Sequence, residues 1–219
     1  MRLSEDMQVC EASGIIRELR QRGLLFPAGE IRTRAAVVSS GIAKLDSLCG
    51  GLPAGGITEI LVPGSGAAGI LYALLAAATS RGESAAVIDP RDGFEASSAT
   101  SACVNLQRLL WVRARGRRQA LHACEIALAS GAFGMVVLDM GPGRGRGPVS
   151  TAAWMRIRNL ARTTGAVVPV ISTLSMAGPF ASLALRVSGS VSRWRGKSRA
   201  DKLFEGMELS FEVTRKRGV

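Results

Sequence analysis

The residues best suited to hold a phosphate form a loop of small side chains between an apolar strand and an apolar helix. The loop consists of Pro63, Gly64, Ser65, Gly66, Ala67, Ala68 and Gly69. Free N–H groups at the start of a helix can bind an anion. The loop contains no lysine or arginine, and its only hydroxyl belongs to Ser65. We therefore expect it mainly to turn the chain, with a weak anion site made of backbone amides as the alternative.

Clusters of arginine are the second candidate for chemistry. The chain contains 28 Lys and Arg against 17 Asp and Glu, a formal net charge of +11, which favours an acidic partner such as DNA, RNA or an acidic protein. The candidate contacts to DNA or to a partner are Arg113, Arg115, Arg117, Arg118, Arg144, Arg146, Arg193, Trp194, Arg195, Lys197, Arg215, Lys216 and Arg217. A GC-rich coding sequence also favours arginine, so a solvated basic surface without a ligand is the alternative.

Other chemical groups do not form a recognisable site. The cysteines at positions 10, 49, 103 and 124 are widely spaced and form no CxxC pair, so they predict neither a zinc site nor a disulfide framework. His122 is the only histidine, and no Ser and Asp accompany it in the pattern of a catalytic triad. We expect no catalytic residue, no bound metal and no cofactor.

The elements that must position these residues alternate between strands and helices. A strand over 58–62 precedes the loop, a helix over 70–79 follows it, and a second strand occupies 85–89. The pattern continues with strands over 109–112, 135–139 and 167–172 and with helices over 117–129 and 151–163. This alternation is typical of βαβ units, and the long apolar runs are typical of strands buried on both faces. The sequence predicts an α/β fold with a mostly parallel twisted sheet flanked by helices.

The C-terminal part of the chain has a different pattern. Strands over 187–194 and 209–213 alternate apolar and polar residues, with a basic segment between them. Such alternation is typical of antiparallel strands with one solvated face. We expect these two strands to extend one edge of the sheet.

An N-terminal helix precedes the alternating region. Ile15, Ile16 and Leu19 share one face of this predicted helix, and that face either packs on its own domain or docks another subunit. We divide the chain into a helical arm at 1–34, a core at 35–195, and a basic strand and tail at 196–219.

Neither export nor membrane insertion is predicted. The first residues include acids where a signal peptide needs an apolar run. The run 60–78 has no charged residue, but Pro63, Gly64 and Gly66 divide it into a strand, a loop and a short helix. We expect a cytoplasmic protein without a membrane partner, with association with the nucleoid as a further option.

The order of short motifs around the loop resembles the RecA recombinase family. That family has a Ser/Thr-Gly pair before a Leu-Asp helix, a Gly-Gly-Leu-Pro turn, a Glu-Ile strand, a Walker A loop and a strand ending in Asp. The corresponding residues here are Ser40-Gly41, Leu45-Asp46, Gly50-Gly51-Leu52-Pro53, Glu59-Ile60, Pro63 to Gly69, and Asp89. Met135 to Asp139 resembles the Walker B strand. The resemblance covers residues 37–195 and implies a RecA-like P-loop core.

The resemblance also identifies the residues of a nucleotide site that this chain lacks. Ala68 stands where the family has the Walker A lysine, and Gly69 stands where it has the hydroxyl that places magnesium. Arg91 replaces the glutamate that activates water, and Thr173 replaces the glutamine that senses the γ-phosphate. Asp139 keeps the place of the magnesium-linked acid, and we expect it to be structural. The resemblance thus implies a chain without nucleotide binding or enzyme activity.

Within the family, the chain resembles the ImuA group, whose members are catalytically silent accessory proteins of SOS-type mutagenesis and translesion synthesis. The N-terminal helix, the altered loop and the basic C-terminus carry this resemblance. It implies an ImuB-type Y-family polymerase homologue as partner, with RecA, a DnaE-type polymerase and single-stranded DNA as further candidates. Because the altered loop cannot switch with ATP, such a chain could limit RecA filaments. The alternatives are a SulA-like inhibitor of cell division and a weak P-loop ATPase in which Lys44 or Arg91 supplies the missing charge.

Overall fold

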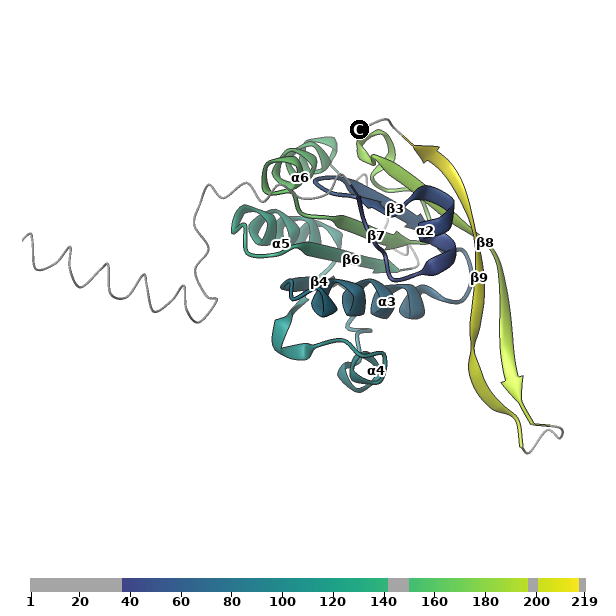
Figure 1. Cartoon of the computed structure of the whole chain (residues 1–219). Coiled ribbons are helices and arrows are strands. Elements are labelled where there is room, and N and C mark those ends of the chain that lie inside the picture. Colours follow the sequence, from purple (N-terminus) through teal and green to yellow (C-terminus); the bar gives the residue numbers. More distant parts are fainter. Residues whose placement is uncertain (1–36, 142–149, 197–200, 217–219) are drawn as a thin grey trace, which may run out of the picture. The chain divides into compact units, whose positions relative to one another are not determined.

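The computed structural model describes residues 37–141, 150–196 and 201–216, and its main element is a seven-stranded mixed sheet (Figure 1). The strands lie in the order β5-β4-β6-β7-β3-β8-β9. They span Leu109–Arg113 (β5), Ala85–Asp89 (β4), Met135–Gly141 (β6), Val168–Ser172 (β7), Ile57–Leu61 (β3), Leu183–Arg195 (β8) and Leu203–Lys216 (β9). Neighbouring strands are parallel except β8 and β9, which are antiparallel. The predicted fold class, a mostly parallel sheet with antiparallel edge strands, is confirmed.

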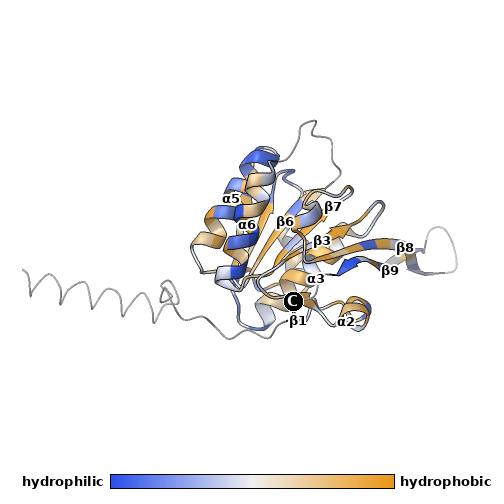
Figure 2. Cartoon of the chain, turned by 90° about the horizontal axis from the view of Figure 1, so that it is seen from above, coloured by the Kyte–Doolittle hydropathy of each residue, from blue (hydrophilic) through white to orange (hydrophobic). Residues whose placement is uncertain are grey.

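Helices cover both faces of this sheet. They are α2 (Ala43–Cys49), α3 (Ala67–Ser80), α4 (Ala96–Ser101), α5 (Arg117–Ala129) and α6 (Thr151–Thr164), and a small ladder pairs β1 (Val37–Val38) with β2 (Leu52–Pro53). α3 and α4 pack on one face, and α5 and α6 lie side by side on the other (Figure 1 and Figure 2). No helix within the described ranges combines the length and the hydropathy needed to cross a membrane.

Each face of the sheet contributes to its own apolar core. Val87 and Val137 belong to the cluster that includes Leu74 of α3, whereas Leu138 belongs to the cluster that includes Trp154 of α6. Successive residues of the inner strands therefore point to two different buried faces. This arrangement explains why the sequences of these strands are apolar without interruption.

The parallel pairing brings the carboxyl ends of several strands to one edge of the sheet, which we call the carboxyl edge. The amide of Val62, just after β3, donates a hydrogen bond to the carbonyl of Ser172 at the end of β7 (2.7 Å). Asp89 ends β4 opposite Arg113, which ends β5. The small-residue loop, the acidic strand ends and one arginine cluster therefore share this edge.

Three elements extend further than the sequence indicated. α3 begins at Ala67, so the last three residues of the small-residue loop form its first turn. Alanine has the highest helix propensity, which favours this early start. β8 and β9 also exceed the predicted 187–194 and 209–213. In β8, residues 183–185 are buried and show no alternation, so the alternating pattern does not mark the start of that strand. The proposed boundary at residue 196 falls beside the turn between these two strands, and β9 belongs to the same sheet as the core.

A buried acid in the central strand anchors the segment that connects β7 to β8. Glu59 in β3 is 1% exposed. Its carboxyl group accepts hydrogen bonds from the hydroxyl of Ser175 (2.9 Å) and from the amides of Met176 and Ala177, the last at 2.9 Å. All of these donors lie within 173–182, so Glu59 fixes this connection against the sheet.

We predict that Glu59→Ala lowers the free energy of unfolding by about 3 kcal/mol, because it leaves buried backbone amides without an acceptor. Urea unfolding followed by circular dichroism measures this change. Glu212→Ala, at an exposed position of β9, is the matched control and should change the free energy by less than about 0.5 kcal/mol. A loss below about 1 kcal/mol for Glu59→Ala would show that these hydrogen bonds contribute little.

Candidate functional site

The small-residue loop links β3 to α3 at the carboxyl edge. Gly66 is the N-cap of α3 and has a φ of +111°, a left-handed conformation that glycine adopts without strain. No side chain caps α3 through a hydrogen bond. The amides of Ala67, Ala68 and Gly69 therefore have no acceptor within the helix. This turn can offer backbone N–H groups to an anion, but its side chains add no charge.

The other side of the loop contacts the outermost strand. A Cβ atom on Gly66 would lie 2.9 Å from Cδ2 of Leu209 in β9. A cavity of about 620 Å³ adjoins this contact, and mainly apolar groups of α2, α3 and β9 line it. Lys44 also lines this cavity, with its Nζ 3.8 Å from Oε2 of Glu208. The lysine that the sequence suggested as a replacement for the Walker A lysine thus pairs with an acid of β9.

Two acids lie at the carboxyl edge, at the ends of β4 and β6. Asp89 is fully buried and accepts hydrogen bonds from the amides of Arg91 (2.9 Å) and Phe94 (2.8 Å). Asp139 has a buried Oδ1 that finds no hydrogen-bond donor among the described residues. The side chain of Arg91 lies over Gly141, where a Cβ atom would collide with its guanidinium. Arg91 is therefore an exposed cation whose side chain lies near Gly141 and acts electrostatically on Asp139.

The surroundings of Asp139 shift its pKa in opposing directions. Burial raises the pKa of the Asp139 carboxyl above its ordinary value, and repulsion from Asp89 adds to the rise. Attraction to Arg91 and a hydrogen bond from the backbone of Gly141 lower it in part. The net direction is upward, because the loss of hydration is the largest contribution. Ionisation of Asp139 therefore lowers the stability of the folded chain, even with Arg91 nearby.

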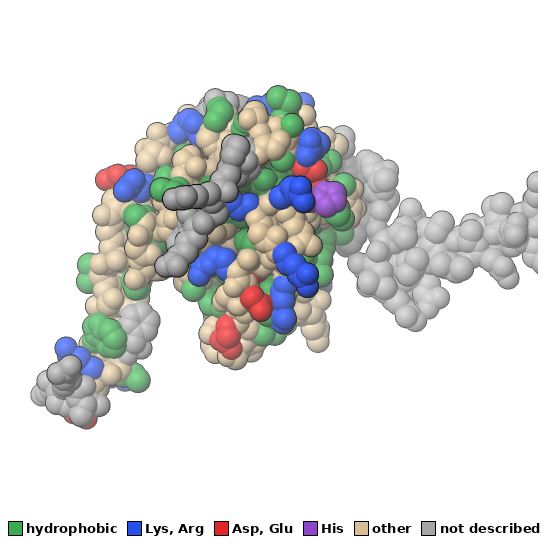
Figure 3. Space-filling view, turned by 180° about the vertical axis from the view of Figure 1, so that it is seen from behind, with side chains coloured by type: hydrophobic (Ala, Val, Ile, Leu, Met, Phe, Trp, Pro, Cys, Tyr) green, Lys and Arg blue, Asp and Glu red, His purple; other side chains and the backbone are tan. Residues whose placement is uncertain are grey.

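Four of the predicted arginines come together where β5 joins α5. We call this surface the basic corner, and it consists of Arg113, Arg115, Arg117 and Arg118. Nε of Arg113 lies 3.0 Å from Oδ1 of Asp92, and its guanidinium carbon lies 4.2 Å from the centre of the Trp111 ring. Trp111 is partly buried and packs against the apolar core that includes α3. Figure 3 shows Lys and Arg side chains gathered on this side of the molecule around the single histidine.

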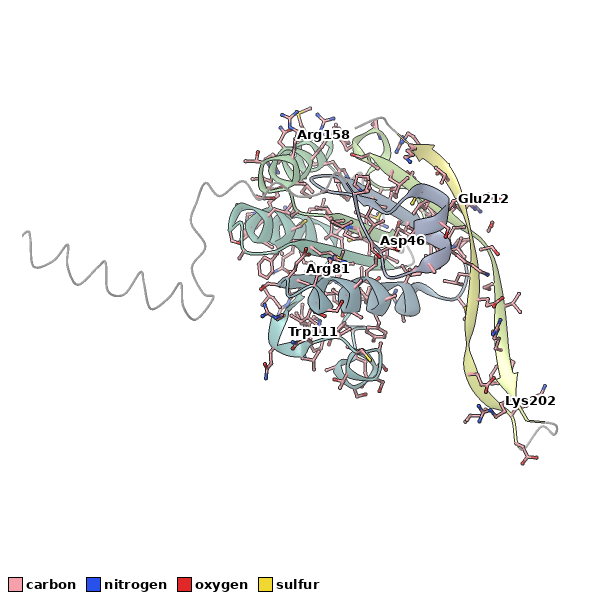
Figure 4. The ribbon with its side chains drawn as sticks, viewed as in Figure 1. Asp46, Arg81, Trp111, Arg158, Lys202 and Glu212 are labelled. Carbon is pink, nitrogen blue, oxygen red and sulfur yellow. The ribbon has the colours of Figure 1, made fainter. Side chains whose placement is uncertain are left out.

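In the β8–β9 hairpin, two of the predicted arginines lie beside acids of the opposite strand. Arg193 pairs with Glu208, and Nε of Arg195 lies 2.6 Å from Oε1 of Glu205. The charged residues described between positions 186 and 212 are Arg186, Arg193, Arg195 and Lys202 against Asp201, Glu205, Glu208 and Glu212 (Figure 4). Trp194 is 54% exposed among them. The described charges between positions 186 and 212 therefore balance, whereas the sequence suggested a basic surface, and Arg215 and Lys216 follow at the end of β9.

The last predicted cations contact the core. The guanidinium of Arg215 donates a hydrogen bond to the carbonyl of Gly178, and Nζ of Lys216 donates one to the carbonyl of Cys49 (3.1 Å). These contacts hold the end of β9 against the rest of the sheet. The remaining predicted site residues lie outside the described residues, and they are Ile15, Ile16, Leu19, Arg144, Arg146, Lys197 and Arg217.

Sequence reasoning missed the acids that pair with the hairpin arginines. Glu205 and Glu208 are opposite or diagonal to Arg195 and Arg193 only once the register of β8 and β9 is known. The alternation of Arg and Glu along the two strands is the signal that could have indicated these pairs. The contact of Leu209 with Gly66 has no comparable signal, because it joins residues far apart in the sequence.

Comparison with known proteins finds curated relatives of this chain. Protein RecA of Lactococcus lactis subsp. cremoris strain MG1363 is 33% identical over 138 residues, which are 61% of this chain and 36% of that protein. The chromosomal protein RecA of Lactococcus lactis subsp. lactis strain IL1403 gives the same values. This chain thus spans about a third of the length of these curated relatives.

A solved structure described as the crystal structure of the RadB recombinase shares the fold. The TM-score is 0.54 at 20% sequence identity, and the match covers 68% of this chain and 82% of that chain. At this identity the similarity concerns the fold alone. A family model described as the RecA N-terminal domain matches residues 15–142, which is more than half of the chain. The chain therefore belongs to the RecA N-terminal domain family.

Proposed function

We propose that this chain is a RecA-like accessory protein of DNA repair that neither binds nor hydrolyses ATP and acts by binding other proteins. The observation that carries the proposal is the small-residue loop. None of its side chains offers a positive charge to a β- or γ-phosphate, and Gly69 offers no hydroxyl to a magnesium ion. The membership of the RecA N-terminal domain family supports the link to DNA repair.

The acids at the carboxyl edge support the same proposal. A site for Mg-ATP in this fold needs an acid that is free to hold the metal. In this chain, the exposed Arg91 lies over Gly141, and its attraction lowers in part the pKa of Asp139 that burial raises. The Arg91 guanidinium at this position repels a divalent cation, because like charges at short range oppose each other.

The hairpin supports a protein as the binding partner. It extends away from the layers of helices (Figure 1), and its described charges between positions 186 and 212 balance. Val191, Trp194 and Leu203 are 65%, 54% and 64% exposed. Exposed apolar side chains that gather on one element are typical of protein–protein contacts.

The finer proposal assigns the chain to the ImuA group. Its main partner is then an ImuB-type Y-family polymerase homologue, and RecA and a DnaE-type polymerase are further partners. In this role the chain supports translesion synthesis during SOS-type mutagenesis and limits RecA filaments, because it presents a RecA-like surface without a nucleotide switch.

We predict that calorimetric titration with Mg-ATP produces no saturable heat, because the loop cannot neutralise the triphosphate. Lys44→Ala and Arg91→Ala are the informative variants. Lys44 lines the cavity beside Ala68 and Gly69, and Arg91 is a cation close to the acids at the ends of β4 and β6. Saturable binding by the wild-type chain that either variant abolishes would contradict the proposal and favour a weak ATPase.

We predict that Asp139→Asn stabilises the chain at neutral pH and that this gain shrinks as the pH falls to about 4. The pKa of Asp139 is raised in the folded state, so below the ordinary value of 3.8 both states hold the proton. As the pH rises through the folded-state pKa, the wild-type chain places a desolvated charge at the end of β6 and loses stability. Urea unfolding at several pH values measures the difference between the two chains.

The control for this measurement is Asp92→Asn, at a side chain that is 62% exposed. An exposed ion pair contributes little to stability, so we expect only a small effect at every pH. A gain for Asp139→Asn that grows toward acidic pH would contradict the assignment of a raised pKa.

We predict that the chain co-purifies with an ImuB-type polymerase homologue and with RecA, and that the hairpin makes one of these contacts. The combined variant Val191→Ser, Trp194→Ser and Leu203→Ser should weaken that complex at least about tenfold, because it removes the apolar anchors. Leu48→Ser with Ile126→Ser removes exposed apolar side chains elsewhere and should leave both complexes intact. Absence of any complex at micromolar concentration would contradict the proposal.

A further inference from the structure

The basic corner carries positive charge that the described structure does not neutralise. Arg115, Arg117 and Arg118 form no ion pair with any residue in the described ranges. Arg113 pairs with Asp92, but the two side chains are 64% and 62% exposed, so solvent screens this contact. Arg193 and Arg195 of the hairpin differ, because each of them forms an ion pair with an acid of β9. The corner is therefore the stronger source of positive potential.

Two arginines of the basic corner lie at the N-terminus of a helix, where positive charge is unfavourable. Arg117 and Arg118 occupy the first turn of α5, where the positive end of the helix dipole repels them. This turn contains no acidic residue and no side-chain cap. The neighbouring helix α6 also lacks an acid and a side-chain cap in its first turn. An external anion at the corner would relieve the repulsion between these arginines and the start of α5.

We propose that the basic corner binds the phosphate backbone of nucleic acid. A guanidinium group can bind two phosphate oxygens at once, and several in one short segment can follow successive phosphates. A phosphodiester backbone presents its charges at regular spacing, which suits arginines at positions 113, 115, 117 and 118. This inference goes beyond the proposed function and does not depend on whether ATP binds.

Trp111, the aromatic side chain beneath Arg113 in the corner, is not available to stack on a base. Phe94 packs against Trp111 with ring centroids 5.2 Å apart, and the guanidinium of Arg113 covers the Trp111 ring. Single-strand sites that use base stacking need an open aromatic face. Recognition at the corner therefore concerns phosphates, and it positions nucleic acid without selecting a sequence.

The test is a fluorescence-anisotropy titration of the full chain against labelled single-stranded oligo(dT), without nucleotide. The corner variant combines Arg115→Ala, Arg117→Ala and Arg118→Ala. The hairpin variant combines Arg193→Ala, Arg195→Ala and Lys202→Ala. Both variants lose the same charge, from +11 to +8, so they separate a local contact from the effect of net charge.

We expect the corner variant to bind at least about tenfold more weakly than the wild-type chain at roughly 0.1 M salt. The slope of log affinity against log salt concentration should fall by about 2, because each lost phosphate contact on a single strand removes roughly 0.7. The hairpin variant should keep the wild-type slope and an affinity within about twofold. The corner variant should unfold at the same temperature as the wild-type chain or a higher one, because it loses the repulsion at α5.

Three outcomes would overturn the proposal. Equal weakening by both variants would mean that only net charge matters. Unchanged affinity of the corner variant would place the contact elsewhere. Stronger binding of the corner to poly-glutamate than to oligo(dT), lost in the corner variant, would assign it to an acidic protein. Binding or absence of ATP alters none of these readouts, so failure here is distinct from failure of the proposed function.

Discussion

Parallel hydrogen bonding of β3 between β7 and β8 is the constraint on which the other features depend. The register joins Glu59 of β3 to Val170 of β7 on one side and to Ala184 of β8 on the other. Parallel strands require a return connection after each strand, and here helices supply most of these connections. The chain consequently leaves every parallel strand at the carboxyl edge. Side chains that are distant in the sequence meet at this edge. The side chains buried along the strands hold the edge in place and do not reach it.

The cations of this chain have different surroundings, and many of them contact acids or carbonyl groups of the protein itself. Arg91 lies near buried acids, Arg215 and Lys216 hold the end of β9, and Arg193 and Arg195 pair across the hairpin. Cations that have acids or carbonyls beside them contribute little to the field outside the molecule. The net charge of the sequence therefore overstates how much of the surface attracts anions. Most of the attraction from the described residues comes from the side where β5 joins α5.

The fold could be predicted from the sequence because its signals are local. Strands buried on both faces produce long apolar runs, and α5 was located correctly because Gly116 and Ser130 flank its amphipathic pattern. The start of α3 was wrong by three residues, because alanine and glycine in succession mark no boundary. The arrangement of the site was less predictable. The sequence identified Arg91 as a position that differs from the RecA pattern and Asp139 as one that keeps it. That the two lie close together depends on β4 and β6 being neighbours in the sheet.

The hairpin exposes apolar side chains, and it also has features that oppose the association of its outer edge with another copy. No described strand pairs with the outer edge of β9. A long, straight edge of this kind is a template for aggregation between copies. The pairing of β8 with β9 is irregular at three places, between Ala184 and Leu185, Val187 and Gly189, and Arg193 and Trp194. Such bulges bend and twist a strand, and the alternating charges add repulsion, so the irregular hairpin discourages fibre-like stacking of one copy on another.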